Sequence, residues 1–267
     1  MLTKNMKQLI ISLFLLCFAF GTSAQENLEF TVKGVSFTMV YVQGGTFTMG
    51  CTPEQGGDCF DDETPVHTVT LSSYYIGETE VTQELWYAVM GDNPSYFKFK
   101  SGSLKRPVEQ VSWEDCYRFI RKLNELTGKK FLLPTEAQWE FAARGGTKSA
   151  GYKYSGSNDL NSVAWYSENA GGKNSPDYGT HVVKTKKPNE LGIYDMSGNV
   201  LEWCYDWYGD YTSVTQTPPL GAPSGSYRVN RGGSWCDLAR YSRSSCRSLS
   251  GPGARQCYFG LRLVLHH

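Results

Sequence analysis

The sequence predicts a mixed α+β fold that is rich in loops and contains little regular structure. Three features of its 267 residues support this prediction: 28 glycines, an aromatic fraction of 14% and a charged fraction of only 19%. Many glycines and aromatic residues with few charges favour loops held by aromatic packing over a helical bundle. The length, together with the absence of repeats or low-complexity linkers, predicts one domain over residues 25–267.

The N-terminal residues 1–24 have the three parts of a secretory signal peptide: two lysines, an apolar run over 9–20 and small residues at 22–24. The run is too short for a comfortable membrane span, and Cys17 within it is a poor lipidation site. We therefore expect a mature protein that is secreted or held in the periplasm or cell envelope. Its 26 basic and 26 acidic residues balance, which gives no reason to expect nucleic acid or an anionic membrane as partner.

Seven cysteines follow the predicted signal peptide. Because the number is odd, at least one thiol is free or pairs between chains. Cys51 and Cys59 close a short glycine-rich loop, and we expect the first disulfide there. Metal binding is the weaker alternative for this pair, since no CxxC motif or histidine cluster accompanies it.

The N-terminal part alternates apolar and polar residues. Residues 28–50 predict a hairpin of two or three strands around a Gly-Gly pair, and residues 66–76 predict another strand. Three helices are then expected, each after a capping residue: Thr82, Ser112 and Thr135. In the second helix the predicted buried face consists of Trp113, Cys116, Tyr117, Ile120 and Leu123.

After a Gly-Gly pair at 145–146 about fifty residues show little regular pattern. A loop region of this length inside a compact domain is usually functional or held by another element, such as an ion. Short strands are expected again in the segments 192–198, 200–208, 227–235 and 259–265.

Seven motifs stand in a recognisable order over residues 38–264: VQGGTFTMG, DETPVHTVTLSSYYIGETEVTQELW, RPVEQVSWEDC, LPTEAQWEFAARGG, GIYDMSGNVLEWCYDWY, YRVNRGGSW and FGLRLV. Together they resemble the sulfatase-modifying factor family, which includes the formylglycine-generating enzymes. The resemblance implies a variant of the C-type lectin fold. Active formylglycine-generating enzymes oxidise a substrate cysteine at a copper site that is made of two cysteines five residues apart, shortly after an RGGS motif.

This sequence departs from the copper-site pattern. Cys236 stands near the first position after the RGGS motif, but Tyr241 and Ser242 occupy the place of the second cysteine. A single soft ligand cannot hold Cu(I) in two-coordinate geometry. We therefore expect no oxidase activity, with Cys236 as the catalytic residue of the alternative in which the chain is a formylglycine-generating oxidase.

The family resemblance also implies a calcium site in the segment 195–202. Carried over residue by residue, its ligands are the carboxylates of Asp195 and Glu202 and the backbone carbonyls of Gly198 and Val200. Hard oxygen ligands at this spacing suit Ca²⁺. The alternative is that the two carboxylates cap local backbone N–H groups.

The segment 236–258 is the predicted ligand-binding surface. Arg240, Arg243, Arg247 and Arg255 fit the family framework, and ten residues of mixed type stand between them: Cys236, Asp237, Leu238, Tyr241, Ser242, Cys246, Ser248, Ala254, Cys257 and Tyr258. Many relatives have asparagine at several of these positions, and adenine changes in asparagine codons give Tyr, Ser, Cys, Asp, Leu or Ala. Diversity-generating retroelements mutate adenines near the 3′ end of genes that resemble this family. The chain is thus similar to the variable protein of such an element.

These features favour a non-catalytic protein that binds a protein or glycan ligand through an exchangeable surface. Tyrosine and serine suit such adaptable recognition. Three alternatives remain at this point: the formylglycine-generating oxidase named above, acting on a sulfatase cysteine, a structural component of an envelope complex, and a periplasmic factor that acts on another protein or on a pigment precursor. A fold does not fix its chemistry, so the choice depends on the site.

Overall fold

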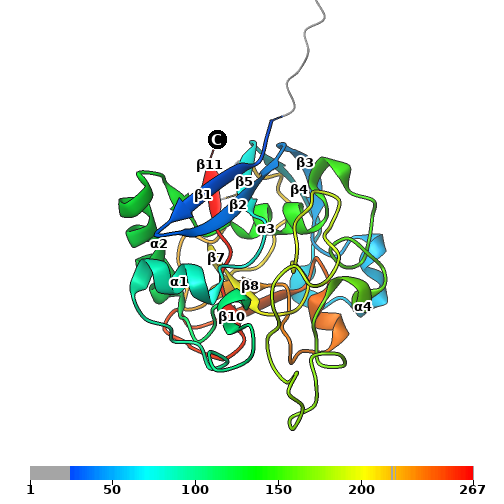
Figure 1. Cartoon of the computed structure of the whole chain (residues 1–267). Helices are drawn as coiled ribbons and strands as arrows, with labels where there is room; N and C mark the ends of the chain where they lie inside the picture. The colour runs from blue at the N-terminus through cyan, green and yellow to red at the C-terminus, as the bar shows by residue number, and fades with distance from the viewer. Residues whose placement is uncertain (1–24, 218, 220, 267) are drawn as a thin grey trace, which may run out of the picture.

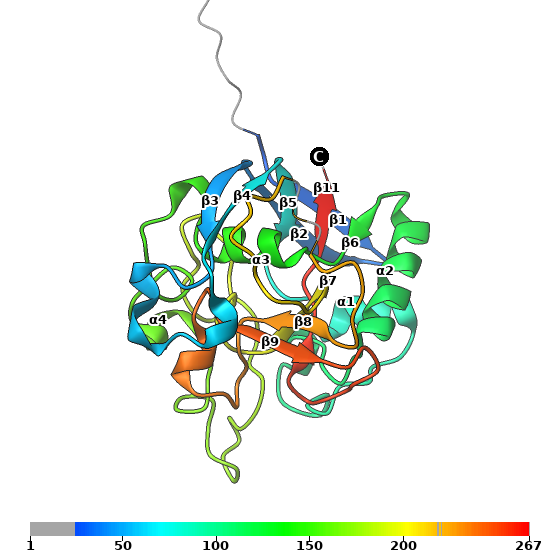
Figure 2. The same cartoon turned by 180° about the vertical axis from the view of Figure 1, so that it is seen from behind.

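The computed structural model describes residues 25–217, 219 and 221–266, so the predicted signal peptide lies outside the described part. The larger sheet lies at one end of the molecule, at the top of Figure 1, and the second sheet lies below it (Figures 1 and 2). The larger sheet has the order β1-β2-β5-β11-β6 and consists of Leu28–Val32, Val35–Val42, Tyr74–Gly77, Val264–His266 and Phe131–Leu132. The second sheet has the order β10-β7-β8-β9 and consists of Phe259–Gly260, Leu201–Trp207, Arg228–Arg231 and Arg247–Ser250.

The remaining elements include a two-stranded sheet of β3 and β4 and four α-helices. Their bounds are Gly45–Met49 and His67–Leu71 for the strands, and Gln83–Met90, Trp113–Thr127, Glu136–Ala143 and Leu160–Val163 for α1, α2, α3 and α4. The fold is therefore mixed α+β and loop-rich, as the sequence predicts. No helix in the described part is both long and apolar enough to cross a membrane.

Helices cover both faces of the larger sheet. Because side chains alternate along a strand, Tyr75 of β5 packs in one core with α1 and α2, while its neighbours Tyr74 and Ile76 pack in a second core with α3. Trp203 of β7 joins the first core and Cys204 the second. The two cores thus connect the larger sheet to the smaller one, which supports the candidate site.

The three predicted helix starts are confirmed. Thr82, Ser112 and Thr135 each accept a hydrogen bond from a backbone N–H of the first turn, which satisfies a donor that the helix leaves unpaired. The predicted buried face of α2 is wrong at Tyr117, which is 51% exposed and stacks on Trp113 at the surface.

Some strand predictions are also wrong. Residues 66–76 form two strands, β4 and β5, which belong to different sheets. The segment 192–198 forms no strand, because Asp195 and Gly198 have φ values of 57° and 79° that extended backbone does not allow. The predicted strand over 259–265 is interrupted at 261–263, so that β10 and β11 also join different sheets.

Candidate ligand-binding face

The candidate ligand-binding face is the surface formed by residues 236–258, which connect β8 to β10 through β9. In Figure 2 this orange-to-red segment lies at the end of the molecule opposite the larger sheet. Part of the loop region between α4 and β7 projects from the same end.

A tight turn after β8 begins the face. Gly232 and Gly233 adopt φ values of 99° and 70°, which favour glycine. A Cβ atom on Gly233 would lie 2.8 Å from the Ser242 hydroxyl oxygen and 2.9 Å from the Tyr241 carbonyl oxygen. Beyond the turn, the Ser234 hydroxyl donates a hydrogen bond of 2.6 Å to Asp237.

Three arginines, of which Arg243 and Arg247 are buried, fix the segment to the rest of the fold. Arg243 is fully buried and forms two hydrogen bonds, of 2.5 and 2.8 Å, to Glu63. Arg247 contacts Glu136 of α3 through two further bonds of 2.7 and 2.9 Å. Arg255 binds Asp115 of α2 with a bond of 2.5 Å from its Nε atom. These contacts support the predicted framework role of Arg243, Arg247 and Arg255, whereas Arg240 is exposed and lies over the ring of Phe60.

The carboxylate partners are charged despite their burial. Burial raises the pKa of Glu63, but the hydrogen bonds from Arg243, Phe60 and Ser245 outweigh it and leave this pKa below its ordinary value. Burial likewise opposes ionisation of Glu136, and the charges of Arg247 and Arg231 lower its pKa overall. Each pair therefore places one full positive and one full negative charge in the interior. Removal of either partner would leave the other charge buried and uncompensated.

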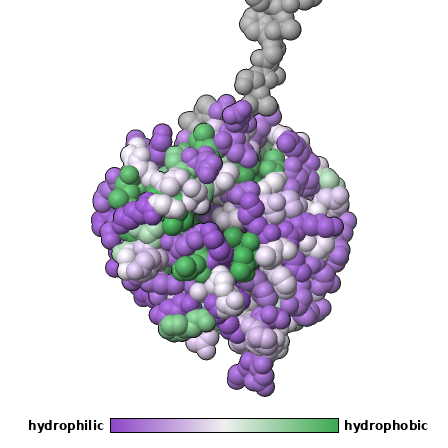
Figure 3. Space-filling view, viewed as in Figure 1, coloured by the Kyte–Doolittle hydropathy of each residue, from purple (hydrophilic) through white to green (hydrophobic). Residues whose placement is uncertain are grey.

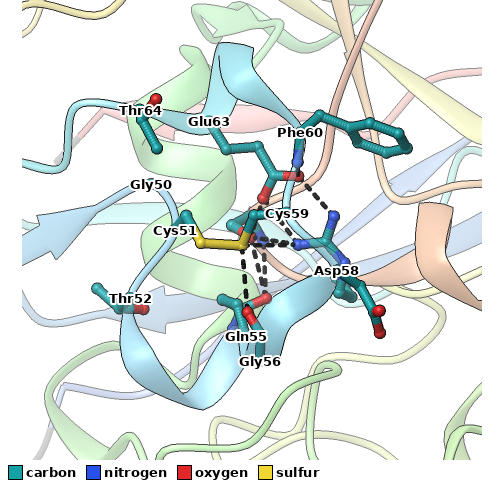
Figure 4. The surroundings of a disulfide bond; sticks show 12 residues. Gly50, Cys51, Thr52, Gln55, Gly56, Asp58, Cys59, Phe60, Glu63 and Thr64 are labelled. Carbon is teal, nitrogen blue, oxygen red and sulfur yellow. Dashed lines mark hydrogen bonds and ion pairs between the residues drawn. A yellow bond between two sulfur atoms is a disulfide. The ribbon is translucent and has the colours of Figure 1, made fainter.

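The predicted disulfide between Cys51 and Cys59 is confirmed, and the loop that it closes supports the face. Figure 4 shows Glu63 folded back toward this loop. Gln55 within the loop accepts hydrogen bonds of 3.3 and 3.1 Å from the backbone N–H and hydroxyl of Ser245. Phe60, just after the loop, stacks on Tyr241 with ring centroids 5.6 Å apart. The sequence indicated the disulfide, but no signal in it indicated these distant contacts.

Most of the ten predicted ligand-binding residues reach the surface. Cys236 and Leu238 are exposed, and six others are partly exposed: Asp237, Tyr241, Ser248, Ala254, Cys257 and Tyr258. Ser242 is fully buried beside Gly233 and does not reach the surface, and Cys246 is 3% exposed. Exposed and buried positions thus alternate irregularly between the fixed arginines.

Four of these residues meet around one cavity of about 280 Å³. Asp237, Tyr241, Cys246 and Ser248 contribute to its wall, and the remaining wall is formed by Leu201, Gly232, Gly233 and Arg247. The guanidinium group of Arg247 is bound to Glu136. The cavity therefore combines a carboxylate, a phenol, a thiol and a hydroxyl within the predicted surface.

The thiols of the face do not reproduce the two-cysteine spacing of a copper site. Cys236 lies 3.4 Å from the Ser234 hydroxyl, and burial raises the pKa of its thiol. Burial is the main cause that raises the pKa of Cys257 to about 11, and Glu109 adds to it. No group of three or more His, Cys, Asp or Glu residues that could hold a metal ion occurs in the described ranges.

The predicted calcium ligands fit a cation in part. Asp195 is buried, and its Oδ1 atom has no hydrogen-bond partner among the described residues, while its Oδ2 accepts a bond of 2.8 Å from the Lys184 N–H. Both oxygens of Glu202 are instead bound by Arg262, and one also accepts a bond from Trp139. A cation here would depend on Asp195 and the backbone carbonyls of Gly198 and Val200.

Comparison with known families and proteins gives a consistent result. A family model described as the sulfatase-modifying factor enzyme 1-like domain matches residues 26–267. The chain is 36% identical to "Chaperone protein LppX" of Paenibacillus barcinonensis, over 86% of this chain and 90% of that protein. It is 30% identical to the formylglycine-generating enzyme of Streptomyces coelicolor, over 84% of this chain and 87% of the enzyme.

Among solved structures, the chain is similar to Treponema denticola variable protein 1. The TM-score is 0.79 and the sequence identity 37%, over 91% of this chain and all of that one. Similarity at this level supports a common fold for the two chains.

Proposed function

The chain belongs to the sulfatase-modifying factor family, and from this premise we propose that it is a non-catalytic, secreted member that binds a protein or glycan ligand through the candidate face. One observation carries the proposal: in the segment 236–258, one set of residues holds the fold and another set is exposed. Its arginines form buried ion pairs with Glu63 and Glu136, whereas residues such as Leu238, at 57% exposure, have no comparable structural role. This arrangement allows the surface to change while the fold is kept.

Two of the similar proteins carry names that fit binding, "variable protein" and "chaperone protein", whereas a third is a formylglycine-generating enzyme. A surface that varies on a constant framework is also what a diversity-generating retroelement would produce. A reverse-transcriptase gene and a near-copy of the segment's coding bases beside the gene would support this origin, and their absence would remove it.

The side of the molecule drawn in Figure 3 is mostly hydrophilic, with hydrophobic groups in small patches. The candidate face combines hydrophobic and polar side chains that reach the surface, such as Leu238 and Ser248, and recognition by a few side chains suits it better than a broad apolar contact. Tyr241 and Tyr258 are partly exposed on the face and offer this kind of contact.

Removal of the exposed side chains of the face is expected to abolish ligand binding without unfolding the protein. The variant combines Leu238→Ser, Tyr241→Ser and Tyr258→Ser, and its matched control combines Tyr87→Ser and Leu126→Ser, which are exposed on α1 and α2. The measurement is binding to arrays of glycans and purified surface proteins, together with the melting temperature of each variant. Equal binding by the wild type and the face variant would contradict the proposal.

The oxidase alternative is favoured by one observation, the exposed thiol of Cys236 just after the RGGS turn. Incubation of the mature protein with Cu(I), oxygen and a cysteine-containing sulfatase peptide tests it by mass spectrometry. Aldehyde formation that is lost in Cys236→Ser would replace the binding proposal with catalysis.

We further propose that Ca²⁺ binds at Asp195, since this buried carboxylate has an oxygen without a partner in the described structure. Ligand linkage predicts a lower melting temperature in chelator than in excess Ca²⁺. In Asp195→Asn the difference between the two conditions is expected to disappear. An unchanged melting temperature of the wild type would contradict the calcium site.

A further inference from the structure

The cavity of the candidate face contains a carboxylate without a positive partner. The carboxylate of Asp237 accepts a hydrogen bond of 2.6 Å from the neutral Ser234 hydroxyl. Across the described part of the chain no lysine, arginine or histidine forms an ion pair with it. Burial raises the pKa of this carboxyl, and the hydrogen bonds from Ser234 only partly oppose it.

The cations near the cavity are committed to other groups. Arg247 is bound to Glu136, to the Asp62 carbonyl and to the Gly209 carbonyl. Arg240 lies over the rings of Phe60 and Tyr241, at 4.7 and 4.9 Å from their centroids. Neither guanidinium neutralises Asp237, so the charge of the cavity wall remains negative at this point.

The shape of the cavity limits the group that can enter. Its volume of about 280 Å³ accommodates a side chain or a single sugar ring, not a whole protein segment. Tyr241 also lines the cavity, but its ring already contacts Phe60 and the Arg240 guanidinium, and its hydroxyl accepts a hydrogen bond of 2.9 Å from Arg240. The feature that attracts an organic cation is therefore the carboxylate of Asp237, which has no ion-pair partner among the described residues.

We propose that the cavity binds a primary ammonium group of the ligand, with Asp237 as its ion-pair partner. This inference rests on the proposed function, because it assigns the chemistry of one subsite within the same face. An ammonium group supplies the positive charge that is missing beside Asp237. It has three N–H donors, so it can also donate a hydrogen bond to Ser248, which lines the cavity. A lysine side chain of a protein ligand and an amino sugar both carry this group.

The test uses small probes with the mature wild-type protein. N-acetyl-lysine methylamide is expected to bind in the millimolar range by NMR titration, whereas the norleucine derivative, which lacks the ammonium group, is not. Asp237→Asn is expected to raise the Kd of the lysine probe by about 10- to 100-fold, which corresponds to the loss of one charge-assisted hydrogen bond. Asp92→Asn, at an exposed aspartate outside the cavity, is the matched control and is expected to have no effect.

Equal binding of the norleucine derivative, unchanged binding in Asp237→Asn, or no saturable binding of either amine would overturn the inference. Glucosamine serves as the second amine. Tighter binding of the lysine probe indicates that the ammonium group belongs to a protein ligand, and tighter binding of glucosamine indicates that it belongs to an amino sugar. If the amine binds but the face variant keeps its ligand, the proposed function fails and the cavity assignment stands. If only the amine test fails, the proposed function stands without this subsite.

Discussion

Replacement of Arg243 by alanine is expected to lower the free energy of unfolding by about 3–5 kcal/mol, because it leaves the buried charge of Glu63 without its partner. Both side chains are fully buried, and the pair joins the candidate face to the disulfide loop. Chemical denaturation monitored by circular dichroism measures the change. Arg240→Ala is the control: this arginine is exposed over Phe60, and its loss is expected to cost less than about 1 kcal/mol.

The same pair predicts a pH dependence. Since the pKa of Glu63 is lowered in the folded protein, its contribution to stability is complete above the ordinary value of 4.5. It is lost as the pH falls further, toward the lowered pKa of the folded state. Arg243→Ala should therefore approach the wild type in stability under acidic conditions. A constant difference between the two proteins at every pH would contradict the assignment of a charged pair.

Gly233→Ala is expected to destabilise the protein by about 2–4 kcal/mol, from backbone strain at positive φ and from steric overlap with the neighbouring chain. The new Cβ would lie 2.8–3.0 Å from atoms of Ser242 and Tyr241, two of them in the backbone of Tyr241, which cannot easily move away. Since the turn holds the cavity wall, the variant is also expected to lose binding of the amine probe.

Gly251→Ala is the matched control for this turn. Gly251 lies in the same segment, has no positive φ, and a Cβ there would meet no atom within 4 Å. Thermal melts of the two variants should therefore differ clearly. Equal melting temperatures would show that the conformation of the RGGS turn does not restrict this part of the fold.

Local signals in the sequence predicted those parts of the fold that depend on neighbouring residues. The helix starts at Thr82, Ser112 and Thr135 follow from capping, which involves residues only three positions apart. The disulfide between Cys51 and Cys59 follows from a short loop. Strand pairing joins distant segments, so the sequence did not indicate that residues 66–76 divide between two sheets.

In the candidate site, too, local features could be predicted from the sequence and long-range contacts could not. Residue types and family framework identified the arginines of the segment 236–258, but the acids that bind them lie far away in the chain, as Glu63 does. The burial of Ser242 depends on the Gly233 turn, which residue type alone does not reveal. The unpaired charge of Asp237 emerges only once the partners of Arg240 and Arg247 are known.

The central claim is that a fixed arginine framework carries a face whose other residues are free to change. Saturation libraries at Leu238, Tyr241, Arg243 and Arg247, displayed on cells and sorted for resistance to protease, measure this directly. The first two positions should accept nearly every amino acid in folded molecules, while the two buried arginines accept almost none. Equal tolerance at all four positions, or folding that requires the native residues at 238 and 241, would contradict the claim.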